Sequence, residues 1–383
     1  MVDEVRTVGW GGRLGRSIKG VLVGALLSIL SFPLLFWNEG RAVHAAKGLE
    51  EGQKAVVSVS ADKVDAGNEK KLVHLTGEAT TAETLTDDEF PAASAKAIVL
   101  SRDGAIYQWI ETKEEKKTKS VGGSERTEIT YHFEKSWMDR TVDSSEFHKD
   151  SEDYRRLSPV NAGTLPYTSK KWNAKKITLG AFTLPDSLVS SMATEKLEVK
   201  DAPSGMAVLL AKVADGGYYF GIDPKVPLVG DVRVSFQVVR PQTVSVLGQQ
   251  VGDLVGSYST TQDTTILRLD QGTKTADAMF QAAKAENAAM TWILRLVGLV
   301  MMFIGLALVF EPLGVLADIL PFMGDLLRLG TGLFAGLLAL SLSLLTISVA
   351  WVFYRPLLGV PLLVGSVALL VYGKKMGAGK RKS

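Results

Sequence analysis

The chain contains no cysteine among its 383 residues. This absence excludes disulfide bonds, metal sites with cysteine ligands and thiol nucleophiles. It does not identify a compartment. An extracytoplasmic domain would, however, have to be held together by its own apolar core, which a segment of roughly 250 residues is long enough to form.

Histidine is scarce, and the motifs of common enzymes are missing. The four histidines, His44, His74, His132 and His148, do not fall in the spacings of zinc hydrolases. The sequence also lacks the Gly-x-Ser-x-Gly nucleophile elbow and the glycine-rich lysine loop that cradles phosphate. We therefore predict no catalytic, metal-binding or cofactor-binding residues and no enzymatic activity. The formal net charge of only +2 gives no reason to expect a nucleic-acid partner.

Long apolar runs are present, although the average hydrophobic content of 46% is ordinary. They cover residues 20–37, 291–310, 329–354 and 357–372, and their lengths predict four transmembrane helices. The fourth run would be about 24 Å long as a helix, shorter than a typical hydrocarbon core of about 30 Å. A re-entrant hairpin of the last two runs is therefore an alternative. A cleaved signal peptide is the alternative for the first run.

Basic residues gather at both ends of the chain and predict its orientation. The segment 1–19 carries four of them and the tail 373–383 carries five, and both ends are expected in the cytoplasm. Four spans then place residues 38–290 outside it, and the loop 311–328 inside, as an apolar helix lying in the interface. The basic residues are Arg6, Arg13, Arg16, Lys19, Lys374, Lys375, Lys380, Arg381 and Lys382.

Residues 38–290 alternate between apolar and polar side chains, which is typical of strands. The clearest pattern is a long hairpin of 106–119 with 125–138, joined by a Gly-Gly-Ser turn. Helices are expected at both junctions with the membrane and at 185–193. The predicted fold is an α+β membrane protein. It has four transmembrane helices, one N-terminal and three C-terminal, and a large, mostly β extracytoplasmic domain.

Small residues recur in the apolar runs at spacings that place them on one helix face. Such stripes allow helix backbones to approach closely in a membrane. We favour packing within one bundle over association between chains. The residues are Gly20, Gly24, Ser28, Gly298, Gly305, Gly332 and Gly336.

Charged residues are rare within the predicted spans, which disfavours transport. Arg295 lies about one turn inside the second span, where its side chain can extend to the headgroups. Several polar residues gather at one predicted interface and would be needed by an enzyme acting on lipid or cell wall. They are Asn38, Glu39, Arg41, His44 and Arg355.

Four segments resemble the transmembrane protein 43 (LUMA) family in order and spacing. They are Phe36-Trp37-Asn38-Glu39-Gly40-Arg41-Ala42, Ile106-Tyr107-Gln108-Trp109-Ile110-Glu111-Thr112, Val229-Gly230-Asp231-Val232-Arg233-Val234-Ser235-Phe236 and Trp351-Val352-Phe353-Tyr354-Arg355-Pro356-Leu357. Residues 113–205 fit the family least well. The candidate interface residues from these motifs are Asn38, Glu39, Gly40, Arg41, Tyr107, Trp109, Gly230, Asp231, Arg233, Tyr354, Arg355 and Pro356.

We interpret these motif residues mainly as structural. Asn38 and Gly40 are expected to end the first helix, with Arg41 as an anchor at the headgroups. Arg355 and Pro356 are expected to stop a helix and turn the chain.

The resemblance implies a membrane organiser whose eukaryotic relatives lie in the endoplasmic reticulum and inner nuclear membrane, self-associate and help to organise envelope proteins. A compact, cysteine-free chain of this kind resembles a bacterial member in the inner (plasma) membrane. We therefore expect a self-associating scaffold whose partners are membrane lipids, copies of itself and other membrane proteins. A channel or channel-regulating subunit is the first alternative, and a membrane-interface enzyme is the second.

Overall fold

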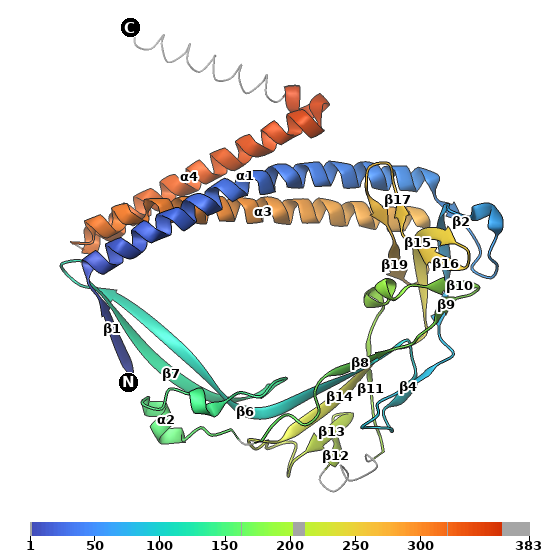
Figure 1. Cartoon of the computed structure of the whole chain (residues 1–383), viewed down its shortest axis with the longest axis horizontal. Helices are drawn as coiled ribbons and strands as arrows, with labels where there is room; N and C mark the ends of the chain where they lie inside the picture. Colours follow the sequence, from blue (N-terminus) through green and yellow to red (C-terminus); the bar gives the residue numbers. More distant parts are fainter. Residues whose placement is uncertain (1, 162, 202–210, 320, 362–383) are drawn as a thin grey trace.

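Three long helices lie side by side along one edge of the molecule, and β structure curves beneath them (Figure 1). This computed structural model describes residues 2–161, 163–201, 211–319 and 321–361. The long helices are α1 (Trp10–Ala55), α3 (Ala276–Ala317) and α4 (Pro321–Tyr354). Within the described residues, these three are long and apolar enough to cross a membrane. The short helix α2 (Glu152–Leu157) belongs to the domain.

The helices extend beyond the predicted spans into the domain. Helix α1 continues without a break through Asn38 and Gly40 to Ala55, so these two residues do not end it. The expected helices at the two membrane junctions are the domain-side ends of α1 and α3. Glycine in a helix interior costs only about 1 kcal/mol relative to alanine, and close packing here compensates for it.

The segment 311–328 differs from the predicted interfacial loop. Helix α3 runs on to Ala317, and α4 begins at Pro321. The two helices therefore meet at a tight turn, and α4 begins before the predicted start at residue 329. The apolar residues assigned to a surface helix instead extend α3 and α4.

The predicted fourth span, 357–372, and the basic tail, 373–383, lie largely or wholly outside the described residues. Helix α4 ends at Tyr354, as the Arg355-Pro356 pair predicted, and residues 356–361 form a further helical stretch.

Two main sheets form the domain in the described part of the chain. The first has eight strands: β1 (Glu4–Val8), β7 (Glu125–Met138), β6 (Val99–Lys119), β14 (Val232–Val239), β13 (Gly217–Phe220) and β12 (Ala211–Ala214) in spatial order, with β8 (Lys170–Asn173) on β6 and β11 (Glu195–Leu197) on β14. The second has seven: β19 (Arg268–Gln271), β15 (Gln242–Val251), β16 (Leu254–Gly256), β10 (Phe182–Leu184), β9 (Ile177–Leu179), β3 (Leu72–Thr80) and β2 (Val57–Ser58). Two small hairpins are β4 (Thr84–Thr86) with β5 (Ser94–Lys96), and β17 (Tyr258–Ser259) with β18 (Thr265–Ile266).

The predicted long hairpin is confirmed. Strands β6 and β7 pair from Ile106 with Met138 to Lys119 with Glu125. The segment expected to be a helix at 185–193 is a 3-10 helix, Asp186–Ser191.

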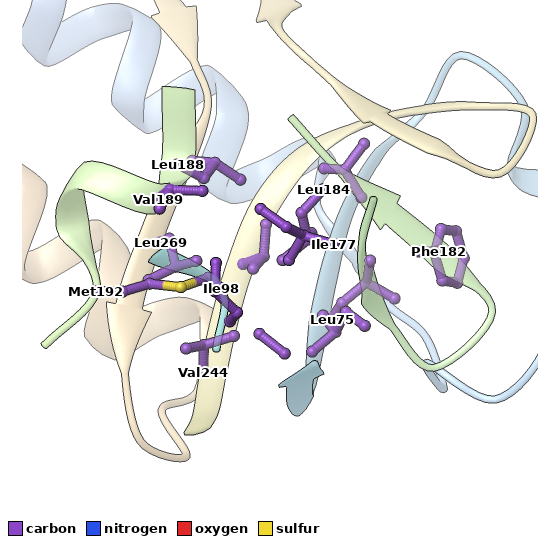
Figure 2. Close-up of a cluster of buried hydrophobic side chains, with 14 of the residues drawn as sticks. Leu75, Ile98, Ile177, Phe182, Leu184, Leu188, Val189, Met192, Val244 and Leu269 are labelled. Carbon is purple, nitrogen blue, oxygen red and sulfur yellow. The ribbon is translucent and has the colours of Figure 1, made fainter. Parts of the chain in front are cut away.

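The main apolar core lies where the seven-stranded sheet meets this 3-10 helix (Figure 2). Leu75, Phe182 and Val244 are completely buried there, and Leu188 and Met192 close the cluster from the 3-10 segment. Burying a large aliphatic or aromatic side chain contributes about 1.5–3 kcal/mol. This cluster is the kind of core that a cysteine-free domain needs.

Small residues bring α1 and α3 into close contact. A Cβ atom at Gly24 would lie 2.5 Å from the Gly305 carbonyl oxygen, and one at Gly305 would meet Ser28. Gly20 faces Leu308, and Gly298 packs against Leu35. These residues therefore pack within one bundle, as favoured from the sequence. On α4, a Cβ atom at Gly336 would approach the Phe303 ring at 3.7 Å, and one at Gly332 would meet nothing within 4 Å among the residues described here.

The N-terminal strand pairs with the long hairpin. Strand β1 pairs antiparallel with β7, from Glu4 with Ile129 to Val8 with Glu125. Two hydrogen-bonded strands cannot have a bilayer between them. The pairing therefore opposes the predicted placement of residues 1–19 and 38–290 on different sides of a membrane.

Replacing Gly24 with alanine is expected to destabilise the helix bundle. The new methyl group meets backbone that cannot move aside, and overpacking typically costs about 1–3 kcal/mol. Gly15→Ala is the matched control because Gly15 lies on the same helix with nothing within 4 Å. It should be neutral or stabilising. Thermal unfolding in detergent measures both, and equal effects would contradict close packing at Gly24.

The β1–β7 register predicts that cysteines replacing Thr7 and Arg126 form a disulfide bond in membranes. Opposed residues of antiparallel strands have Cα atoms about 4.5–5.5 Å apart, within reach of a disulfide. The natural chain has no cysteine to compete. Mass spectrometry after mild oxidation detects the bond, and Thr7→Cys with Glu128→Cys is the out-of-register control. The pairing is refuted if no bond forms and an impermeant maleimide labels the two positions from opposite sides.

Candidate functional site at the ends of the helix bundle

A buried ion pair joins the three helices at the end nearest the domain. Glu39 of α1 is completely buried, and its carboxylate accepts hydrogen bonds from Arg295 Nε (2.6 Å) and Nη2 (2.9 Å) of α3. It also accepts one from Trp351 Nε1 of α4 at 2.8 Å. We call Glu39, Arg295 and Trp351 the Glu39 cluster. A bidentate Arg–carboxylate pair is among the strongest polar contacts in proteins.

Two tryptophans flank the cation of this cluster. The Arg295 guanidinium carbon lies 4.7 Å from the Trp292 ring centroid and 5.8 Å from that of Trp351. Arg295 is therefore held by Glu39 and two aromatic rings of the same bundle, and its extension to the headgroups stays a prediction. Because α1 and α3 run antiparallel, Glu39 near the end of one apolar segment and Arg295 near the start of the other lie at the same level. The sequence signal for this ion pair was a pair of opposite charges at corresponding positions in two antiparallel apolar segments.

The remaining residues of the Asn38–Arg41 segment also join helices. Asn38 Nδ2 donates to the Thr291 carbonyl (3.0 Å), and Arg41 donates to Asn287 Oδ1 (3.0 Å) and Thr291 Oγ1 (3.0 Å). Gly40 is required because a Cβ atom there would lie 2.7 Å from the Tyr354 ring. The Arg355 guanidinium lies 6.0 Å from the Trp351 ring centroid, and the helical stretch after α4 begins at Pro356.

A cavity of about 470 Å³ opens beside these residues, between α1, α4 and the β17–β18 turn. It is lined by Trp37, Gly40, Arg41, His44, Ala45, Gln262, Asp263, Thr264 and Tyr354. Within the described residues, no group of three or more His, Asp or Glu is arranged to hold a metal ion. The cavity therefore offers a mixed aromatic and polar surface.

A second polar cluster lies at the opposite end of the helices. Asp318, buried in the α3–α4 turn, pairs with Arg13 Nη2 (2.5 Å) and Arg328 Nη1 (2.8 Å). Burial by itself raises the pKa of Asp318, but hydrogen bonds from Arg328 and Arg13 outweigh that effect and hold the pKa below its usual value. We call Arg13, Asp318 and Arg328 the Asp318 cluster.

The tip of the long hairpin contacts this second cluster. Arg13 Nη1 donates to the Gly123 carbonyl (2.7 Å), and the Gly122 amide donates to the Ile319 carbonyl (3.0 Å). Lys119 Nζ lies 2.5 Å from Asp325 Oδ1. The charged hairpin tip is therefore a contact surface within the chain, at least in part, and not only a solvated turn.

The motif residues of the domain meet far from both clusters, around the β6–β14 pairing. The Gly230 amide donates to the Tyr107 carbonyl, and the Tyr107 amide donates to the Asp231 carbonyl, both at 2.8 Å. Gly230 has φ +97°, which favours glycine. Asp231 accepts hydrogen bonds from the Tyr219 hydroxyl and the Leu228 amide. Burial, reinforced by this hydrogen bond, raises the pKa of Tyr219.

Aromatic contacts complete this region. The Arg233 guanidinium lies 4.6 Å from the Trp137 ring centroid, and Lys135 Nζ lies 4.8 Å from that of Trp109. The Trp109 amide donates to Asn161 Oδ1 at 2.7 Å. These residues hold strands and loops together, in agreement with the structural interpretation of the motifs.

Replacing either Glu39 or Arg295 alone should destabilise the bundle strongly, and replacing both should cost less than the sum of the two single losses. Glu39→Gln and Arg295→Gln each leave an unpaired charge or an unmet hydrogen bond, and breaking a buried pair costs about 3–5 kcal/mol. The double variant should lose less than the sum, because neither charge is then left alone. Denaturant unfolding in detergent gives the four free energies of the cycle. Additive losses would mean that the pair is not coupled.

Comparison with known proteins identifies the family. The family model described as Transmembrane protein 43 matches residues 106–356. The chain is 33% identical over 378 residues to transmembrane protein 43 of Mus musculus, covering 94% of this chain and 90% of the relative. Identity to the Homo sapiens protein is 32% with the same coverage, and to the Drosophila melanogaster homolog 28%, covering 92% and 93%. No solved structure matches the chain. The chain therefore belongs to the transmembrane protein 43 family.

Proposed function

We propose that this chain is an integral membrane scaffold that associates with copies of itself through α4. The observation that carries this proposal is an open apolar groove of about 510 Å³ on the helix bundle. It is lined by Phe303, Arg328, Leu329, Gly332, Leu333, Gly336, Leu337 and Leu340. Its two glycines supply the small surface that another helix needs in order to approach closely.

The groove differs from the small-residue contacts elsewhere in the bundle. Gly24, Ser28 and Gly305 are already covered by neighbouring helices of the same chain. A Cβ atom at Gly332 would contact no other part of the described chain within 4 Å, and the neighbouring Leu333 is 64% exposed. A helix from a second copy would cover this face by side-chain packing, which drives helix association in lipid.

The two other classes of function have less support. An interfacial enzyme would need a free acid or base, but the Glu39 carboxylate is occupied by Arg295 and Trp351. A channel would need an open polar path, whereas Glu39, Arg295 and Asp318 are held in ion pairs. Paired charges of this kind are better suited to holding helices together than to moving ions.

Location in a bacterial inner membrane, with both termini cytoplasmic and residues 38–290 outside, stays a prediction from the basic residues and the family resemblance. Lipids, copies of the chain and other membrane proteins stay its predicted partners. The β1–β7 pairing is the observation that opposes this sidedness.

The mass of the full chain in lipid nanodiscs tests self-association. Native mass spectrometry or light scattering should find a discrete oligomer. Gly332→Leu and Gly336→Leu should shift it towards the monomer, because a leucine side chain fills the groove. Gly330→Leu is the matched control, since Gly330 lies on the same helix and outside the groove, and a Cβ atom there would meet no described residue within 4 Å. A monomeric natural chain, or dissociation by Gly330→Leu alone, would refute the proposal.

A further inference from the structure

In the part of the chain that the structure describes, no carboxylate pairs with the positive charge of Arg41. Its hydrogen-bond partners are the neutral oxygens of Asn287, Asn38 and Thr291. Among the described residues, no acidic oxygen lies within 4.0 Å of its guanidinium, whereas Arg295 at the same α1–α3 contact is paired with Glu39. A cation held only by neutral groups attracts an anion.

The guanidinium also retains hydrogen-bonding capacity. Arginine has five N–H groups, and Arg41 uses three of them, one on Nη1 and two on Nη2. Of the two N–H groups that remain, the one on Nε is buried and has no partner. The second N–H of Nη1 is therefore the group that a ligand can use. The contacts to Asn287 and Thr291 fix the plane of the guanidinium. A fixed, positively charged donor of this kind suits one oxygen of a phosphate or carboxylate group.

Arg41 lines the cavity beside α1 and α4, together with His44 of the same helix. The volume of about 470 Å³ falls within the range of small-molecule sites. The β17–β18 turn also lines the cavity and contributes the exposed carboxylate of Asp263. The lining therefore contains a fixed cation and an exposed anion that water partly screens.

The surrounding aromatic residues indicate which source of anion can reach the cavity. Trp37 and Tyr354 line it at the ends of two apolar helix segments, and Trp292 lies at the same end of α3. Trp37 is 57% exposed and Trp292 67% exposed. Tryptophan and tyrosine gather at the level of lipid headgroups. The cavity therefore opens where lipid phosphates are concentrated.

We propose that this cavity binds the headgroup phosphate of an anionic glycerophospholipid. Arg41 pairs with the phosphate, and Trp37 and Tyr354 pack against the glycerol and the first carbons of the acyl chains. Asp263 repels the phosphate and weakens binding. Anionic lipids are preferred over phosphatidylcholine, because the choline cation competes with Arg41 for the phosphate.

The test is native mass spectrometry of the full chain in detergent, titrated with phosphatidylglycerol or phosphatidylcholine. The natural chain should retain phosphatidylglycerol in preference. Arg41→Gln should weaken its binding about tenfold, as expected for the loss of one charge-assisted contact. Asp263→Asn should strengthen binding by several-fold, and asparagine tolerates the positive φ of this turn position. Lys47→Gln, an exposed charge outside the cavity, is the control and should have little effect.

Several outcomes would overturn the proposal. A folded Arg41→Gln variant that binds as well as the natural chain would do so, as would an effect of Lys47→Gln equal to that of Arg41→Gln. If Arg41→Gln does not fold, Asp263→Asn decides alone, and unchanged binding refutes the site. Displacement of the lipid by millimolar inorganic phosphate would assign the cavity to a soluble phosphate instead.

Discussion

Neutralisation of charge inside an otherwise apolar helix bundle is the constraint on which the structure depends. A buried carboxylate is very costly unless it is paired, and the cost is greater still where water is absent. Glu39 meets this constraint only when α1, α3 and α4 are all in place, because its partners come from the other two helices. Asp318 meets it at the opposite end with Arg13 and Arg328. The two clusters thereby set the register of the helices.

The position of the domain follows from the same two ends. At one end, α1 and α3 continue directly into the sheets. At the other, the hairpin of β6 and β7 returns to the Asp318 cluster (Figure 1). Strand β6 has 21 residues, about 69 Å, which is also the length of the 46-residue helix α1. The long hairpin is thus long enough to reach from the domain to the far end of the bundle. A charged strand cannot cross lipid. The contact between the hairpin tip and the Asp318 cluster therefore requires both to lie on the same side of a membrane.

The geometry gives most of the motif residues a structural role, although Asn38 and Gly40 join helices and do not end α1. Gly40, Gly230 and Asp231 serve close packing, a turn and a hydrogen-bonded strand end. Arg41 differs from them because its charge is held in place beside a cavity without a carboxylate partner among the described residues. Arg41 joins α1 to α3 and also lines the cavity, so it is suited to the lipid contact proposed above.

The sequence by itself determined the elements: the apolar helices, the hairpin register from Ile106 to Lys119 and the β-rich domain between them. Local patterns suffice for these, since they follow from the period of the side chains and from turn residues. The sequence did not determine the Glu39–Arg295 pair, the β1–β7 pairing or the tight turn at Asp318. Each of these features joins residues more than 100 positions apart or depends on such a contact. The packing of the helices and the hairpin decides which of these distant residues meet. Only the tertiary structure therefore showed that Arg295 is neutralised and Arg41 is not.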